Sequence, residues 1–477
     1  MNLVLICTDQ QRRDGVGCYE NAIVDTPRLD RLASEGLRFT RACVANPICM
    51  PNRMSMFTGC YPRNHGTWTN GLLGAPDLPA LSGLLSSAGY ATASVGKLHF
   101  MPYGGGDHGW ESRARWERLG DDFDWSGPYG GFEHCELSVG HTQAVAHYGR
   151  WFRERGGTDA MLEPGPDETR PLPEELHDSV WVGERSASCI REHRDRPFFL
   201  FASFPDPHHP FDPPESLAAK HANRDLPGPV GGPDDLVTRP SHYTTHFRGG
   251  WHRSGPVAEE HPHGPSREVV RSRRANTAAM IELIDRGVGT ILDAIDECGL
   301  ADDTLVVFTS DHGELLGDHG LWYKGPFFYE GLLGVPLIIR GPGVRTGVTD
   351  ALVSTVDLAP TLLESLAVGV PDAMDGASFA AHLRDGDAPT RDRCLVEYRN
   401  GYRDADRAAM ALVTERFKYV RYQDGERELT DLIADPEERR NVAGDPQYLE
   451  TVRAMEEALL SEVLATGARR PQQISHA

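Results

Sequence analysis

Residues 304–313 read TLVVFTSDHG, an uninterrupted apolar run that ends in Ser310, Asp311 and His312. A run without polar alternation is typical of a strand buried on both faces of a parallel sheet. Residues 3–8 (LVLICT) repeat the pattern and lead into Asp9 and Gln10. Ligands bind beyond the carboxyl ends of parallel strands, so these polar residues are the first candidates for a functional site.

The chain up to about residue 385 continues this alternation of strands and helices. Further buried strands are expected at 89–96, 196–204 and 335–339, and helices at 27–33 and 275–298. Strands that alternate with helices predict an α/β fold, with a mostly parallel central sheet flanked by helices.

Two long segments interrupt the pattern. Residues 101–178 are rich in Gly, aromatic and charged residues, and residues 205–265 are rich in Pro, Gly and His. Structureless segments of this length are usually functional lids or mobile loops. We expect them to determine substrate identity.

The pattern changes again after residue 385. Residues 408–431 alternate like antiparallel strands around a turn at 423–425, and a helix rich in Glu, Leu and Ala is expected at 446–466. The sequence therefore predicts two domains, an α/β domain at 1–385 and a smaller α+β domain at 386–477. The tail from Gly467 is expected to fray.

The composition excludes several functional classes. The 477 residues include 48 Lys and Arg against 70 Asp and Glu, a net charge of −22. This charge argues against a nucleic-acid binder or a peripheral membrane protein, and no apolar run approaches the ~20 residues of a membrane helix. The N-terminus lacks the pattern of a signal peptide, and the nine cysteines form no CxxC pair. We therefore expect a cytoplasmic protein with reduced thiols.

The residues after the two quoted strands suggest a metal site. Asp9 and Gln10 follow one strand, and Asp311 and His312 follow the other. Carboxylate, amide and imidazole groups at adjacent strand ends can converge on one divalent cation. An Asp after a strand is also a common helix cap, so neither pair is decisive alone.

A third element is C-x-P-x-R, at Cys49-Met50-Pro51-Asn52-Arg53, and it gains weight from the motifs that accompany it in order along the chain. These motifs are Gly89-Tyr90, Val95-Gly96-Lys97-Leu98-His99, Pro207-His208-His209-Pro210-Phe211, Thr309-Ser310-Asp311-His312-Gly313-Glu314, Leu316-Gly317-Asp318-His319-Gly320, Lys324, residues 353–364 (VSTVDLAPTLLE), Lys418-Tyr419, Glu428 to Leu432, Asp435 to Glu438, and Asn441. In this order the set resembles the type I sulfatases of the alkaline phosphatase superfamily.

The resemblance implies an alkaline-phosphatase-like fold and a hydrolase of organic sulfate monoesters. In that family a maturation enzyme oxidises the cysteine to formylglycine, which hydrates to a gem-diol. One hydroxyl, its pKa lowered by the metal, attacks sulfur, and the other later expels sulfate. We therefore expect a formylglycine-generating maturase and a small sulfate ester as partners.

The resemblance also assigns roles to individual residues. Arg53 would hold the nucleophile and the metal ligands in register, and four cationic groups would clamp sulfate and transfer protons. The implied metal ligands are Asp9, Gln10, Asp311, His312 and the hydroxyl derived from Cys49. The implied clamp and proton-transfer residues are Lys97, His99, His208 and Lys324. We expect Ca²⁺, with Mn²⁺ and Mg²⁺ as alternatives because one ligand is a histidine.

Two assignments stay open at this point. The family pattern Pro-His-x-Pro selects His208 for the site, and His209 either supports it or packs in the loop. Asn70 lies where some relatives place a substrate contact, but an Asn before Gly71 also fits a turn.

The sequence departs from the family pattern at three positions. The family usually has a second Asp where Gln10 stands, and smaller residues where Met50 and Asn52 stand. A metal set of Asp, Gln, Asp and His also resembles the phosphonate monoester hydrolases, which use the same formylglycine on phosphodiesters. Lys97 and His99 favour sulfate, because those relatives usually lack this pair. A third hypothesis is a protein whose Cys49 is never oxidised and which binds an anion without turnover.

Overall fold

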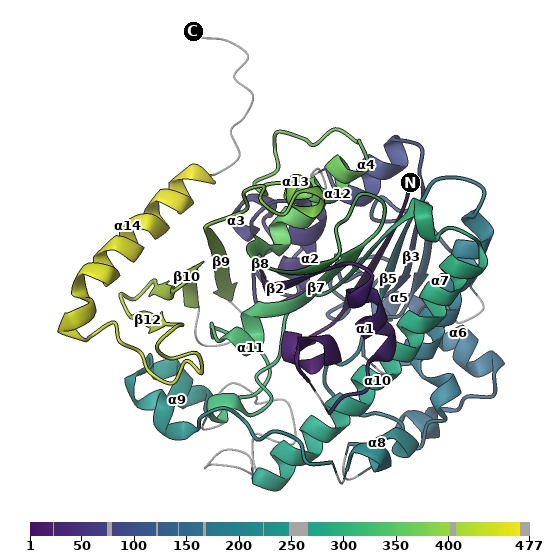
Figure 1. Ribbon diagram of the computed structural model, residues 1–477. Helices are drawn as coiled ribbons and strands as arrows, with labels where there is room; N and C mark the ends of the chain where they lie inside the picture. Colours follow the sequence, from purple (N-terminus) through teal and green to yellow (C-terminus); the bar gives the residue numbers. More distant parts are fainter. Residues whose placement is uncertain are drawn as a thin grey trace.

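The computed structural model describes residues 1–21, 23–73, 79–120, 123–141, 143–165, 168–222, 224–247, 266–400 and 407–467. These residues form an eight-stranded sheet flanked by helices and a separate four-stranded sheet (Figure 1). The segment 248–265 and, beyond Gly467, the tail expected to fray lie outside the described residues.

The large sheet has the order β4-β3-β5-β1-β6-β7-β2-β8. Its strands are β1 (Asn2–Thr8), β2 (Leu37–Cys43), β3 (Ala91–Gly96), β4 (His134–Leu137), β5 (Phe198–Ser203), β6 (Thr304–Ser310), β7 (Gly334–Arg340) and β8 (Gly347–Ser354). The first five strands in this order pair in parallel, whereas β7 is antiparallel to both β6 and β2. The predicted, mostly parallel α/β sheet is therefore confirmed.

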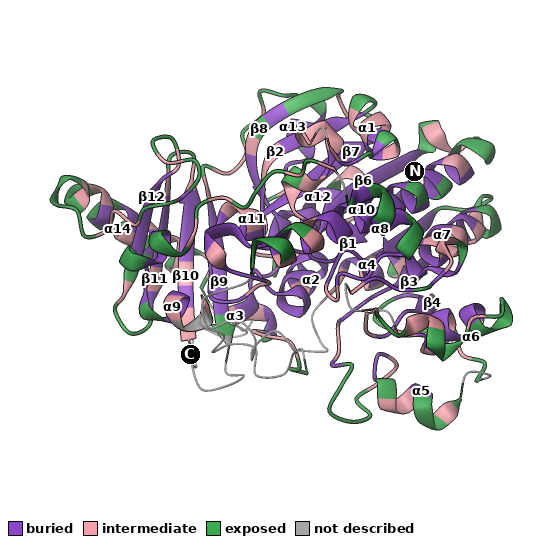
Figure 2. Cartoon of the chain, turned by 90° about the horizontal axis from the view of Figure 1, so that it is seen from below, coloured by how far each residue is buried: buried purple, intermediate pink, exposed green. Residues whose placement is uncertain are grey.

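Helices cover both faces of this sheet because every second residue of a strand points to the same face. Leu3 and Leu5 of β1 belong to one core and Val4 and Ile6 to the other. The core of Val4 and Ile6 contains residues of α1 (Pro27–Ser34), α6 (Ala146–Glu154), α7 (Asp178–His193) and α10 (Arg267–Glu297). The opposite core contains residues of α2 (Cys49–Thr58), α4 (Leu81–Ser87), α5 (Arg113–Leu119), α12 (Leu358–Ser365) and α13 (Ala380–Arg384). Figure 2 shows the central strands buried between the two layers.

The α/β part contains four further α-helices, all of them short: α3 (Pro62–His65), α8 (Glu215–His221), α9 (Ser241–Phe247) and α11 (Glu330–Leu333). Among the described residues, no helix is long and apolar enough to cross a membrane. The expectation of structureless segments at 101–178 and 205–265 is wrong, because α5, β4, α6 and the start of α7 lie within the first and α8 and α9 lie within the second. The sequence gives little indication of a strand in the first segment, because β4 has only four residues, HCEL, and no apolar run.

The C-terminal part forms an antiparallel sheet in the order β12-β11-β10-β9, followed by α14 (Leu449–Ala465). Its strands are β9 (Arg393–Asn400), β10 (Arg407–Thr414), β11 (Phe417–Tyr422) and β12 (Arg427–Asp431). The core under α14 also includes Tyr61 and Val356 from the large α/β part. The division into two domains at residue 385 stays a prediction.

Candidate functional site

The carboxyl ends of β1 and β6 bring two pairs of polar residues together. The amide of Asp311 donates to Thr8 O at 3.1 Å, and the amide of Gln10 donates to Asp311 Oδ1 at 3.0 Å. Gln10 adopts a positive φ of 68°, a conformation that non-glycine residues rarely hold outside constrained sites. The adjacent strand ends thus fix Asp9, Gln10, Asp311 and His312 around one point.

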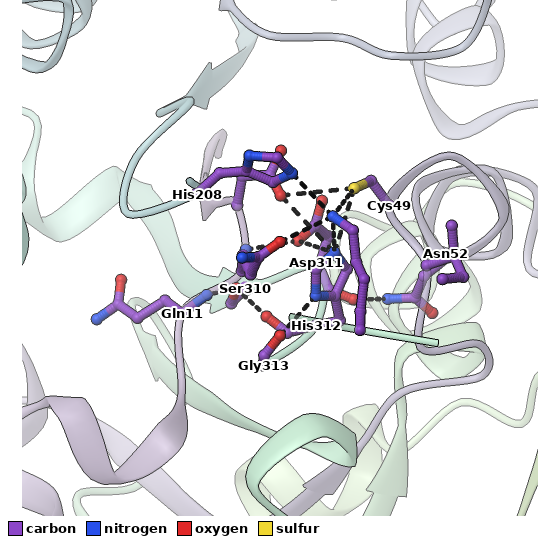
Figure 3. A network of polar contacts seen from close by, with 12 residues as sticks. Gln11, Cys49, Asn52, His208, Ser310, Asp311, His312 and Gly313 are labelled. Atoms are coloured by element: carbon purple, nitrogen blue, oxygen red, sulfur yellow. Dashed lines mark hydrogen bonds and ion pairs between the residues drawn. The ribbon is translucent and has the colours of Figure 1, made fainter. Parts of the chain in front are cut away.

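Cys49 is the first residue of α2 and faces this point (Figure 3). Its Sγ lies 3.2 Å from His312 Nε2 and 3.6 Å from Asp9 Oδ1. One donor atom each from Asp9, Cys49, Asp311 and His312 lies within 4.8 Å of the others, and all four residues are buried. Two carboxylates, an imidazole and the group at position 49 fit a divalent cation.

Gln10 is oriented by Glu314, which sequence reasoning did not assign to the site. A carboxylate only accepts hydrogen bonds, so the Nε2 of Gln10 must face Glu314 Oε2. The same Nε2 lies 3.1 Å from His209 Nδ1, and Gln10 Oε1 accepts from Lys324 at 2.9 Å. The amide oxygen, which is the atom that can ligate a cation, therefore faces Lys324.

Arg53 is fully buried and contacts several parts of the site. Its Nε donates to Asp311 Oδ2 at 2.7 Å, and its Nη1 donates to Lys97 O and Ser203 Oγ, each at 2.8 Å. Burial alone would lower the pKa of Arg53, but Asp311 and Asp9 raise it above its usual value. A permanently charged fork thus joins the ends of β3, β5 and β6.

Asn52 explains one departure from the family pattern. It is fully buried and donates to Asp311 O at 2.5 Å (Figure 3). It also accepts from Thr355 Oγ1 at 2.6 Å. Its side chain therefore ties α2 to the loop that carries Asp311. The larger Met50 is also fully buried at the start of α2.

The loop after β3 places Lys97 and His99 at the same edge. A Cβ on Gly96 would lie 1.8 Å from Ser203 O, so only glycine fits where β3 approaches β5 this closely. Lys97 forms an ion pair with Asp9, and its Nζ lies 2.9 Å from His141 Nε2. Burial, reinforced by Lys97, holds the pKa of His99 well below its usual value.

Lys324 and His208 complete the cationic surroundings of Cys49. Lys324 Nζ lies 2.7 Å from Cys49 Sγ, 2.9 Å from His208 Nε2 and 3.1 Å from His312 Nε2. Burial and Asp9 would raise the pKa of the Cys49 thiol, but Lys324, Lys97 and His312 outweigh them and lower it. Burial, followed by His141 and His209, keeps the pKa of His208 well below its usual value.

These groups line a cavity of about 630 Å³. Asn70 also lines it, and its Oδ1 accepts from the amide of Met50 at 3.1 Å, which supports the first turn of α2. The structure therefore brings together all eleven residues named from the sequence. His209 lies in the wall of the same cavity.

His141 and Glu314 are the site residues that sequence reasoning missed. His141 follows β4, a strand too short to be recognised, inside a segment expected to lack structure. Glu314 stood in the quoted motif after Asp311, but only the fold shows that it contacts Gln10. A strand at 134–137 would have marked His141 by the strand-end argument that found Asp9 and Asp311.

Comparison with known proteins gives consistent matches. The family model described as Sulfatase matches residues 1–368, and the model described as N-sulphoglucosamine sulphohydrolase, C-terminal, matches residues 317–464. The chain is 29% identical over 493 residues to an arylsulfatase of Clostridium perfringens, covering 97% of this chain and 94% of the relative. It is 31% identical over 496 residues to the multifunctional alkaline phosphatase superfamily protein PehA of Trinickia caryophylli, covering 96% and 94%. The structure of the phosphonate monoester hydrolase SpPMH from Silicibacter pomeroyi has a TM-score of 0.83 at 25% identity, covering 100% of this chain and 98% of that one.

Proposed function

The chain belongs to the sulfatase family of hydrolases, within the alkaline phosphatase superfamily, and we propose that it cleaves an organic sulfate monoester with a formylglycine derived from Cys49 as nucleophile. The observation that carries this proposal is the arrangement of cationic groups around Cys49. Lys324 Nζ is 2.7 Å from its sulfur, and Lys97, which lines the same cavity, is ion-paired with Asp9. A monoanionic sulfate ester matches this local positive charge within an acidic protein.

The residues fit the proposed cofactor and modification. A divalent cation held by Asp9, Gln10, Asp311 and His312 would act as a Lewis acid that activates the nucleophile; we propose Ca²⁺, with Mn²⁺ or Mg²⁺ as alternatives. Formylglycine at position 49, made by a maturase, would supply one hydroxyl for attack on sulfur and a second to expel sulfate.

The remaining residues bind the ester and handle its charge and proton. Lys97 and Lys324 donate hydrogen bonds to the non-bridging oxygens of the ester, where negative charge develops in the transition state. The negative charge of the bound ester favours the protonated form of His208, whose Nε2 lies 2.9 Å from Lys324 Nζ, and this form protonates the leaving alcohol. His99, which lines the same cavity, assists this proton transfer. Arg53 keeps Asp311 and the loop of Lys97 in place, and Asn70 supports α2 at the substrate side.

A phosphonate monoester or phosphodiester is the second candidate substrate. Gln10 and His312 in the metal set, together with the likeness to SpPMH over the whole chain, favour it. Lys97 and His99 support the sulfate ester instead.

The experiment uses protein produced together with a maturase and an aryl sulfate as substrate. Cys49→Ala should lose turnover while keeping its melting temperature. Cys49→Ser should release at most one equivalent of phenol, because its sulfate ester has no second hydroxyl to expel sulfate. Cys298→Ala, which changes a half-buried cysteine at the end of α10, is the matched control. Turnover by Cys49→Ala close to that of the unchanged protein would contradict the proposal.

A further inference from the structure

Three imidazole rings form a stack in the wall of the cavity. His208 lies in the middle, with His141 at 3.6 Å between ring centroids and 9° between planes. His209 lies on the other side, at 4.0 Å and 26°. The ring of His208 is therefore held on both faces and is left with contacts in its own plane. Its Nδ1 faces the carbonyl of His209, and its Nε2 faces Lys324.

The two outer rings of the stack, His209 and His141, also contact other residues of the site. His209 Nδ1 lies 3.1 Å from Gln10 Nε2, and the rings of His209 and Tyr323 pack edge to face at 4.3 Å between centroids. His141 comes from the loop after β4, and its Nε2 lies 3.6 Å from Asp9 Oδ2. The stack thus joins the loops after β1, β4 and β5.

His141 also determines the direction of Lys97. An ammonium group carries three N–H bonds. Lys97 Nζ uses one for Asp9 and one for His141 Nε2 at 2.9 Å. Because Lys97 lines the cavity and two N–H groups of its ammonium are held by Asp9 and His141, the third N–H group is available to a ligand in the cavity.

We propose that His141 is a positioning residue of this site, which aims the Lys97 ammonium at the sulfate oxygens and holds the His208 ring where its Nε2 reaches the leaving oxygen. The proposal rests on the proposed function, because it takes the ester to bind beside Cys49. His141 links the two lysines of the cavity, since it contacts Lys97 directly and Lys324 through His208.

Three substitutions separate the two roles of His141. His141→Phe keeps a ring on His208 but removes the acceptor for Lys97. His141→Gln keeps an acceptor within reach of Lys97 but removes the ring. His141→Ala removes both. The matched control is His134→Ala, which changes a half-buried histidine at the start of β4 that lines a different pocket.

The test measures kcat and KM for a series of aryl esters whose phenols differ in pKa. Proton donation to the leaving oxygen matters most for the least acidic phenols, where a general acid contributes about 10²–10⁴-fold. We expect His141→Ala and His141→Gln to lose about 10-fold in kcat for the best leaving group and about 100-fold or more for the poorest. We expect His141→Phe to raise KM about 10-fold across the series and to leave the leaving-group dependence of kcat unchanged. His134→Ala should stay within about twofold.

Melting temperature and metal content are measured for every variant. The proposal is supported if kcat depends more steeply on the pKa of the leaving phenol in His141→Ala and His141→Gln than in the unchanged protein, but not in His141→Phe. Values within about twofold of the unchanged protein for all three variants would overturn it, and so would an equal loss for every leaving group. The series is run with aryl sulfates and aryl phosphonates. If the unchanged protein prefers phosphonates, the proposed substrate fails, and the role of His141 is then judged on the phosphonate series.

Discussion

The contact between Gln10 and Glu314 makes a prediction about why this chain carries an amide where the family usually has a second aspartate. Gln10 Nε2 donates to Glu314 Oε2, and Glu314 Oε1 already accepts from the amides of Leu316 and Tyr323. Burial raises the pKa of Glu314, but these amides favour its charged form. A carboxylate at position 10 would therefore lie directly against a second carboxylate. The perturbation that tests this is Gln10→Glu, which has the same shape as the native side chain.

The magnitude follows from the geometry. Two like charges about 4 Å apart repel by about 4 kcal/mol at an effective dielectric constant of about 20. The same substitution also brings a negative charge next to Lys324, which offsets part of the cost in the single variant. The double variant Gln10→Glu/Glu314→Gln exchanges donor and acceptor and restores the hydrogen bond. Because the Lys324 attraction occurs in both the single and the double variant, it cancels in the double-mutant cycle.

The assay is urea unfolding of the four proteins at about pH 8 with the metal removed by a chelator. The expected coupling free energy between positions 10 and 314 is at least about 4 kcal/mol, with the double variant more stable than the two single effects predict. Gln447→Glu, an exposed change of the same chemistry, should stay within about 0.5 kcal/mol. A coupling free energy below about 1 kcal/mol would refute the claim that Glu314 explains the amide at position 10.

Three further outcomes follow from the site. Arg53→Lys loses the fork that contacts Asp311, Lys97 O and Ser203, so unfolding should cost about 3–5 kcal/mol less, as measured by denaturant titration; an unchanged midpoint would contradict the role of Arg53. Burial lowers the pKa of His65 to about 3, so its contribution to stability is fully present above pH ~6.5 and falls by about 2.3 kcal/mol as the pH drops from 6.5 to 4.5. His65→Gln should flatten this part of the stability profile, and a profile parallel to that of the unchanged protein would count against it. A chelator should lower the melting temperature, and Ca²⁺ at about 100 times its Kd should restore about 2.7 kcal/mol; no shift in melting temperature would argue against a cation at Asp9 and Asp311.

The part of the fold that the sequence predicted is the part encoded in apolar runs. The buried runs at 3–8 and 304–309 located β1 and β6, and the rule that ligands lie beyond such strands located Asp9 and Asp311. The direction of a strand is not encoded in this way, since β7 is as apolar as β6 yet runs antiparallel to it. The four-residue β4 carries no such run, so His141 could not be found.

The sequence predicted which residues form the site better than it predicted the role of each residue. Ordered motifs named Lys97, His208 and Lys324, and the structure brings these residues to one cavity. Contacts between residues far apart in the chain, such as Glu314 with Gln10, depend on how loops after different strands meet. The open choice between His208 and His209 illustrates this, because both line the cavity and only their partners differ.

The most direct test of the central claim is the ratio of kcat/KM for an aryl sulfate to kcat/KM for an aryl phosphonate monoester. The protein is produced with a maturase, and Cys49→Ala provides the blank. The sulfatase account predicts a ratio well above one that disappears in the Cys49→Ala protein. A ratio well below one would contradict it, and would leave a phosphonate ester hydrolase in which Lys97 and His99 require another explanation.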